Sequence, residues 1–504
     1  MLTQLRTFSS AYPPPEARSR LLGLEIGDWL ILAAISLIGG ALVLLLANLL
    51  FTIWTYLACV VSLAFFMHLC LLSDRYVAFP GLISFVAAVE MLLAPMLATS
   101  FPPSFHLYDM AIPLGVYLKY AVPATMALWL GLHWPISRNL DAQMRGFQTN
   151  PLSARLRWWL DVTLIVGVIL ASFPESFPGS LFFFITVISS FRFFAALAWM
   201  ITLTPGWKLR VAVVFAQLIA ITSAQGIFYT LLQWAGFFVL VYGFRFRWRF
   251  KLALALILAL MSAVVLQYIK SDYRIYLHSE NPNLVERMSA MAKMARDQVV
   301  GPGEQHVATT FGDVLVRFNQ GWIVSHILYR VPSRVPYAAG DTIKDAVIYT
   351  LMPRALFPNK HEGASRILFA RFTGMHLDRG TTMGLSIIGE MYANFGYWGG
   401  ILGTFAFGSL VGLAFAVFFK LSRQNPLWWA AAPIVLLTAI EPAFNLEDIS
   451  NYIVKSALVL FIFSFEVPGI RELLRLKPIR GDKEKLISIG VPRWVAAFPL
   501  RRMR

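Results

Sequence analysis

The feature of this sequence that most restricts its fold is the recurrence of long apolar stretches between short polar segments. A helix needs about 20 mainly apolar residues to cross the hydrocarbon core of a bilayer. Such stretches occur at 29–47, 50–72, 77–98, 111–132, 158–173, 179–203, 250–268, 397–419, 427–441 and 451–467. The run 211–244 is too long for one helix and is interpreted as two short spans that turn near Gln225-Gly226. We therefore expect an all-α, polytopic integral membrane protein with about twelve transmembrane helices.

Composition excludes several other classes of protein. Of the 504 residues, 58% are hydrophobic and 14% are charged, whereas a soluble domain carries roughly a quarter charged residues. A soluble enzyme, a disordered tail and a nucleic-acid-binding module are therefore excluded. Both cysteines, Cys59 and Cys70, lie in one apolar run, and the histidines form no zinc-binding pattern. We expect neither a disulfide framework nor a metal site, and no cofactor.

The positive charges predict which side of the membrane each loop faces. Lys and Arg outnumber Asp and Glu by 43 to 27, a net charge of +16, and they gather in short loops, as they do on the cytoplasmic side of membrane proteins. The basic loops are 133–158, 204–210, 245–251, 420–423 and the tail after 468, whereas 99–110 and 174–178 contain no Lys or Arg. This alternation predicts that both termini are cytoplasmic. The Lys and Arg residues are therefore expected to interact with the lipid bilayer and not with nucleic acid.

The connection 269–384 is far longer than the others and is predicted to be a partly helical periplasmic loop. The positive-inside rule does not apply to a loop longer than about 60 residues. Asn283 followed by Glu286 indicates a helix start, and further helical segments are expected at 311–329 and 341–353. The chain then divides into a cytoplasmic N-terminal tail (1–28), transmembrane helices 1 to 9 (29–268), the periplasmic layer (269–384), a re-entry segment with transmembrane helices 10 to 12 (385–467) and a basic cytoplasmic tail (468–504).

Two prolines restrict the backbone of a short basic segment in this loop. Pro353 and Pro358 flank Arg354, and Lys360 follows. Rigidly held cations suit a phosphate, which guanidinium binds bidentately and ammonium binds as a point charge. Arg317, earlier in the loop, is a further candidate. The alternative is an interfacial loop whose cations extend to lipid headgroups.

Four polar residues are spaced to line one face of a helix that re-enters the membrane: Ser386, Glu390, Asn394 and Tyr397. A carboxylate at such a depth is a candidate for a functional site. The alternative for Glu390 is an ion pair with an arginine of the loop. The glycines at 396, 399, 400, 403, 408 and 412 favour close helix packing.

Three more ionisable residues lie in or beside predicted spans. Arg192 is at the middle of 179–203 and Glu90 is near the middle of 77–98. Burying either charge alone costs about 3 kcal/mol on insertion scales. Either the two pair with each other, or Arg192 lines a polar cavity. Glu441, at the outer end of its span, is interpreted first as part of a hydrated acidic loop.

The sequence resembles the Wzy-type O-antigen and exopolysaccharide polymerases of bacterial inner membranes. The resemblance rests on about a dozen spans with a large late loop, on Pro-Arg-x-x-x-Pro-x-Lys from Pro353 to Lys360, and on Gly-Glu-x-Tyr-x-Asn-x-Gly from Gly389 to Gly396, which leads into a glycine-rich span. It covers residues 310–445. The rest of the chain is similar in hydropathy only.

The resemblance implies a glycosyltransferase that moves a growing glycan from undecaprenyl diphosphate onto the sugar of another lipid-linked repeat unit. Cations would stabilise the departing diphosphate, and a partly buried carboxylate would serve the acceptor hydroxyl as a base. A chain-length regulator and a flippase are the implied protein partners. The implied roles are Arg317, Arg354 and Lys360 at the diphosphate, Glu390 with Arg354 in catalysis, Tyr392 and Asn394 at the sugar, and Arg192 and Glu441 as weaker candidates.

Three alternative functions remain from the residues alone. An O-antigen-ligase-like glycosyltransferase would share the donor but would depend on a loop histidine, for which His326, His361 and His376 offer no distinguishing context. A transporter or flippase for lipid-linked sugars would show paired halves and charges along the full depth. A non-catalytic scaffold of an export complex would give no reason for Glu390 and Arg354 to lie at one interface.

Overall fold

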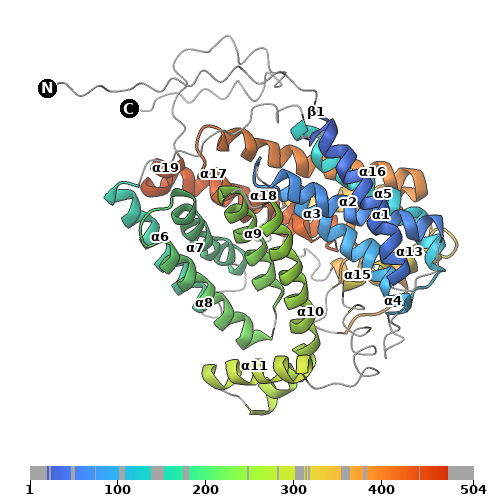
Figure 1. Cartoon of the computed structure of the whole chain (residues 1–504), viewed down its shortest axis with the longest axis horizontal. Coiled ribbons are helices and arrows are strands. Elements are labelled where there is room, and N and C mark those ends of the chain that lie inside the picture. The colour runs from blue at the N-terminus through green and yellow to red at the C-terminus, as the bar shows by residue number, and fades with distance from the viewer. Residues whose placement is uncertain are drawn as a thin grey trace, which may run out of the picture.

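The chain is almost entirely helical in the parts that the structure describes (Figure 1). One short antiparallel strand pair, β1 (Arg20–Leu21) and β2 (Leu24–Glu25), precedes the first helix. The computed structural model describes residues 20–21, 24–46, 52–73, 75–100, 108–137, 152–173, 181–226, 228–246, 249–280, 283–300, 312, 315, 318–352, 364–378, 383–441 and 443–474.

The helices follow the apolar pattern of the sequence. Those before the long loop are α1 (Ile26–Leu46), α2 (Ile53–Leu72), α3 (Phe79–Ala88), the π-helical turn η1 (Val89–Leu93), α4 (Ala94–Ser100), α5 (Leu114–Ser137), α6 (Ala154–Ser172), α7 (Phe182–Thr202), α8 (Trp207–Gln225), α9 (Tyr229–Phe246) and α10 (Arg249–Glu280). Those within the loop are α11 (Leu284–Val300), α13 (Gly321–Arg330), α14 (Asp341–Leu351) and α15 (Ala364–Thr373). The last are α16 (Ile387–Ser422), α17 (Trp428–Leu436), the 3₁₀ turn η4 (Leu437–Ile440), α18 (Leu446–Glu466) and α19 (Pro468–Leu474).

A helix covers each apolar stretch of the sequence, and seven of the described helices are long and apolar enough to cross a membrane. The run 211–244 forms two helices, as expected. They separate at Gly226, whose φ of +61° is a conformation that glycine adopts without strain. Large apolar side chains such as Leu30, Ile38 and Leu45 are exposed on α1. Such a surface is stable against lipid rather than water, so the protein is an all-α membrane protein.

The third span changes helix type at η1, and Pro95 provides the reason. Proline has no N–H and its ring clashes with the carbonyl four residues earlier, here that of Met91. The Tyr117 hydroxyl donates to this carbonyl at 2.7 Å. The Glu90 carbonyl in the same turn accepts from the backbone N–H of Gln320 at 3.2 Å. The π turn therefore attaches the third span to the segment that precedes α13.

Helices α5 and α16 cross at close range because small residues line their contact. A Cβ atom on Gly408 would lie 2.6 Å from the Leu128 carbonyl oxygen, and one on Gly412 would lie 2.6 Å from that of Leu132. Both distances are too short for any larger residue. The close packing expected from the glycine pattern is confirmed here.

The loop between α10 and α16 contains the expected helices. Asn283 Oδ1 accepts from the Glu286 N–H at 3.0 Å and Glu286 Oε2 accepts from the Asn283 N–H at 2.8 Å, which is the capping box at the start of α11. Helix α10 continues to Glu280 without a break at residue 269, and α11 lies across its end (Figure 1). Helix α13 contacts α4, and its Ser325 Oγ accepts from the N–H of Ala111, in the segment before α5, at 3.0 Å.

Candidate functional site

The cations predicted to bind diphosphate lie outside the residues that the structure describes. These are Arg317, Arg354 and Lys360. Phe318 and Gln320, which follow Arg317, are described and line a cavity.

Glu390 occupies the first turn of α16 and is 1% exposed. Its Oε2 accepts from the backbone N–H of Leu446, the first residue of α18, at 2.8 Å. A carboxylate at this end of a helix satisfies a free N–H and interacts favourably with the helix dipole. Thr342 lies against the same carboxyl group. The partners of Glu390 in the described chain are thus a helix N-terminus and a hydroxyl, and the expected arginine partner is not among them.

Asn394, one turn further along α16, fixes the start of α14. Its Nδ2 donates to Thr342 Oγ1 at 2.7 Å and to the Glu390 carbonyl at 2.8 Å. Its Oδ1 accepts from the Gly340 N–H at 3.0 Å. The side chain is buried and its donors and acceptor are all in use, so Asn394 joins two elements of the protein.

The stripe from Ser386 to Tyr397 is shorter than expected. Gly396 has φ +69° and ψ −159°, which interrupts the helix before Tyr397. Tyr397 consequently faces α5, where its hydroxyl donates to the Lys119 carbonyl at 2.9 Å. The expectation that all four residues share one face is wrong for Tyr397, because it assumed a continuous helix. Ser386 is the N-cap of α16 and accepts from the Gly389 N–H at 3.0 Å.

Tyr392 lies on another side of α16, against aromatic residues. Its ring contacts Tyr120 edge to face, with centroids 4.9 Å apart, and lies near Tyr337. Its hydroxyl donates to the Val331 carbonyl at 3.4 Å. Tyr392 is half-buried among these contacts.

Arg192 lies in the contact between α6 and α7 and does not pair with Glu90. Its Nη1 donates to the Ser189 carbonyl at 2.7 Å, and its guanidinium carbon lies 4.2 Å from the centre of the Phe193 ring. A Cβ atom on Gly167 would lie 2.9 Å from the Arg192 Cβ. Glu90 interacts instead with Glu441. Of the two alternatives for Arg192, the pair with Glu90 is wrong, because η1 directs Glu90 toward η4.

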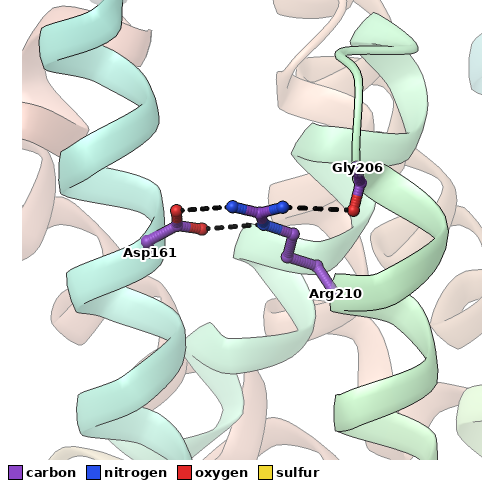
Figure 2. Close-up of polar contacts among 3 residues, drawn as sticks. All are labelled: Asp161, Gly206 and Arg210. Carbon is purple, nitrogen blue, oxygen red and sulfur yellow. Dashed lines mark hydrogen bonds and ion pairs between the residues drawn. The ribbon is translucent and has the colours of Figure 1, made fainter.

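A partly exposed ion pair that the sequence does not predict joins α6 to α8 (Figure 2). Arg210 donates through Nε to Asp161 Oδ1 at 3.1 Å and through Nη2 to Oδ2 at 2.8 Å. Its Nη1 donates to the Gly206 carbonyl at 3.3 Å, and its guanidinium lies over the Trp199 ring. This bidentate geometry fixes the start of α8 and has a structural role.

A cavity of about 240 Å³ lies between η1, α9, α10 and η4. Most of its wall is apolar, and Leu260 of this wall is also exposed on the surface of the bundle, where lipid would lie. The apolar lining residues are Leu82, Phe85, Val86, Val89, Leu232, Gly236, Leu256, Ala259, Leu260, Phe318 and Ile440. The polar lining residues are Glu90, Tyr229, Gln233, Gln320 and Glu441.

Two carboxyl groups face each other across the polar part of this cavity. Glu90 and Glu441 are close enough to interact electrostatically, and Tyr229 lies against Glu441. The Oε2 atom of each carboxyl is buried and has no hydrogen-bond partner among the described residues. Gln233 orients Tyr229, because its Nε2 donates to the Tyr229 hydroxyl at 3.0 Å and to the Leu437 carbonyl at 2.7 Å. This polar cluster offers hydrogen-bond acceptors and donors to a ligand with hydroxyl groups.

From the sequence, the members of this polar cluster could be recognised only one at a time and not as a group. Glu90 and Glu441 both stand out as carboxylates in or beside apolar runs, but they are 351 positions apart by their residue numbers. Tyr229, Gln233 and Gln320 carry no local pattern. Within the described ranges, no three His, Cys, Asp or Glu side chains are grouped so that they could hold a metal ion.

The chain was compared with protein-family models, curated proteins and solved structures, and none of the three comparisons gave a match. The fold and the cavity therefore define the class of protein: an all-α membrane protein with an amphipathic cavity and a pair of carboxyl groups at its polar end.

Proposed function

We propose that this protein is a polymerase that joins undecaprenyl-diphosphate-linked oligosaccharide repeat units into a surface polysaccharide. The observation that carries the proposal is the amphipathic cavity with Glu90 and Glu441 at its polar end. Its apolar wall suits a polyprenyl chain, and its carboxyl, amide and phenol groups suit sugar hydroxyls. A lipid-linked glycan has both chemical parts in one molecule.

The sequence supports a place for the diphosphate beside this cavity. Arg317 immediately precedes the lining residue Phe318. Arg354 and Lys360 belong to the same loop. A diphosphate leaving group carries negative charge that fixed cations stabilise as the bond breaks. The proposal therefore assigns the lipid and sugar parts of the substrate to this cavity and, from the sequence, the diphosphate to these cations.

The distribution of polar groups favours a reaction over transport. A flippase needs polar groups along the whole depth of its pathway and shows paired halves with matching broken helices. In this cavity the polar side chains form one interacting group: Glu90 interacts with Glu441, Tyr229 lies against Glu441, and Gln233 donates to Tyr229. The proposed location is the bacterial inner membrane, with this group and the loop 269–384 on the periplasmic side and both termini in the cytoplasm. A flippase and a chain-length regulator are the proposed protein partners.

The test is reconstitution of the purified protein in lipid nanodiscs with a synthetic undecaprenyl-diphosphate-linked repeat unit. We expect a ladder of products that differ by one repeat unit, separated by gel electrophoresis and identified by mass spectrometry. Heat-inactivated protein in the same nanodiscs is the control. Transfer of a single glycan to a different acceptor without a ladder would indicate the ligase-like alternative. Movement of unchanged substrate across a vesicle membrane would indicate a transporter.

A further inference from the structure

The acceptor hydroxyl needs a base, and Glu390 is already engaged elsewhere. Its Oε2 accepts from the Leu446 N–H at the start of α18, and it is 1% exposed. A proton on this oxygen would remove the acceptor on which the helix end depends. Glu390 also has no place in the lining of the cavity.

Glu441 meets the geometric requirements that Glu390 does not. It lines the cavity at the end of η4, and its buried Oε2 has no hydrogen-bond partner in the described part of the chain. Its neighbours Glu90 and Tyr229 come from two other elements, η1 and α9. The lining side chains contributed by α10 are apolar. Within the described lining, the ionisable groups are therefore these three.

Glu90 is held in place by the backbone around it. The π turn η1 presents its side chain, and the Glu90 carbonyl is bound by the Gln320 N–H at 3.2 Å. Gln320 itself lines the cavity. Glu90 and Glu441 interact electrostatically, so the two carboxyl groups take up and release protons as a pair.

We infer that Glu441 is the general base of the glycosyl transfer and that Glu90 is its positioning residue, an inference that rests on the proposed function. The acceptor hydroxyl oxygen forms a bond to C1 of the donor sugar. The bond between C1 and the diphosphate oxygen breaks, and its electron pair leaves with undecaprenyl diphosphate. The hydroxyl proton moves to the Glu441 carboxylate. The step is a substitution without change of oxidation state, so it needs no redox partner.

The experiment measures elongation rate and substrate binding side by side for four variants: Glu441→Gln, Glu441→Asp, Glu90→Gln and Glu466→Gln. Rates are expressed per mole of monodisperse protein in nanodiscs. Binding is measured by crosslinking to a lipid-linked repeat unit with a photoreactive group in its prenyl chain. Glu466 is exposed at the far end of α18, so its variant controls for the loss of one negative charge.

We expect Glu441→Gln to lower the elongation rate by at least about 100-fold, as loss of a general base does, while crosslinking stays within about twofold of wild type. Glu441→Asp should keep measurable activity because it retains a carboxylate, and Glu466→Gln should match wild type. Glu90→Gln should lower the rate and displace the acidic limb of the rate–pH profile, because the two carboxyl groups titrate as a pair and the variant removes one of them. A purely structural role for Glu90 would leave that limb in place.

The outcomes separate this inference from the proposed function. A ladder from wild type and an undiminished ladder from Glu441→Gln would overturn the base assignment and leave the polymerase proposal intact. An unchanged acidic limb in Glu90→Gln would overturn the role of Glu90. If wild type binds the lipid-linked unit but forms no ladder, or neither binds nor elongates it, both the function and the inference are wrong.

Discussion

At the scale of single residues, the carboxyl groups of this protein have different surroundings and therefore different expected roles. Glu390 accepts a hydrogen bond from a helix N-terminus, Asp161 forms a bidentate ion pair, and Glu90 and Glu441 face a cavity. The first two carboxylates are matched by donors of the protein. Glu441 has a hydrogen bond with Tyr229, but Oε2 of Glu90 and Oε2 of Glu441 are buried and have no described donor. Unmatched polar atoms that face a cavity are those available to a ligand.

Glu390→Gln should reduce stability more than activity. The amide can still accept from the Leu446 N–H, but the hydrogen bond is no longer charge-assisted, which should lower the free energy of unfolding by about 1 kcal/mol. Protein level, thermal unfolding midpoint and the glycan ladder are measured together, with Ser386→Ala, which removes the cap of α16, as the structural control. Normal abundance with no ladder would instead restore the catalytic role expected from the sequence.

Substitutions of Arg354 test the predicted cation site, whose residues lie outside the described part of the chain. Arg354→Lys keeps the charge but loses bidentate geometry, so elongation should fall about tenfold or more, and Arg354→Ala should fall further. Both variants should insert and accumulate normally. Arg296→Ala, an exposed arginine on α11, is the control. An alanine variant that polymerises at the normal rate would make Arg354 a lipid-headgroup anchor.

His326 should make the stability of the protein around α13 decrease at acidic pH. Burial lowers the pKa of His326 below its usual value, and Arg330 adds to the effect, although a hydrogen bond with the Asp109 backbone opposes it. The unfolded chain therefore binds a proton more readily than the folded chain. Stability is present above the unfolded pKa, near ~6.5, and is lost as the pH falls through it. Thermal unfolding between pH 7.5 and 5 should show a smaller acid-induced decrease for His326→Gln than for wild type.

At the scale of helices and their joints, irregular turns place the side chains of the candidate site. The π turn η1 directs Glu90 toward η4 and away from Arg192, and Gly396 separates Tyr397 from the residues before it. Each irregularity is stabilised by contacts from another element: the Tyr117 hydroxyl and the Gln320 N–H at η1, and Tyr337 beside Gly396. Helix joints of this kind are frequent at functional sites.

The Arg210–Asp161 pair gives a prediction for the contact between α6 and α8 (Figure 2). Both side chains are partly exposed, at 26% and 34%, so solvent reduces the strength of the interaction. A double-mutant cycle of Arg210→Lys and Asp161→Asn should give a coupling energy of about 1 kcal/mol in thermal unfolding. Elongation per mole of folded protein should not change. Strictly additive effects would mean that the pair contributes nothing beyond each residue's own contacts.

At the scale of the whole molecule, the described helices α13 and α14 of the loop 269–384 lie at one end of the helix bundle and helix α19 lies at the other. Ser325 on α13 binds the segment before α5, and Thr350 on α14 lies 3.0 Å from Ser450 at the start of α18, so the layer covers one end. At the other end α19 packs on the first turns of α6. The alternation of basic and non-basic loops predicts that the end covered by this layer is the periplasmic one.

The orientation is tested with one cysteine. Ser333 is exposed after α13, whereas Cys59 and Cys70 are buried, so Ser333→Cys should provide the reactive thiol. We expect a membrane-impermeant maleimide added to intact spheroplasts to label this variant, and wild type to remain unlabelled. Labelling of Ser333→Cys only in inverted vesicles would reverse the topology and remove the basis of the proposed function.

The sequence by itself determined the features that depend on neighbouring residues. Apolar stretches became helices because a helix satisfies its backbone groups within one segment, and Asn283 with Glu286 capped α11 as their spacing predicts. The glycines of α16 predicted close packing without naming α5 as the partner. Tertiary structure alone decided that Glu390 binds Leu446, 56 positions away, and that Glu90 meets Glu441. Such contacts depend on how helices pack and where they bend, and a linear pattern records neither the partner of a helix nor the break at Gly396.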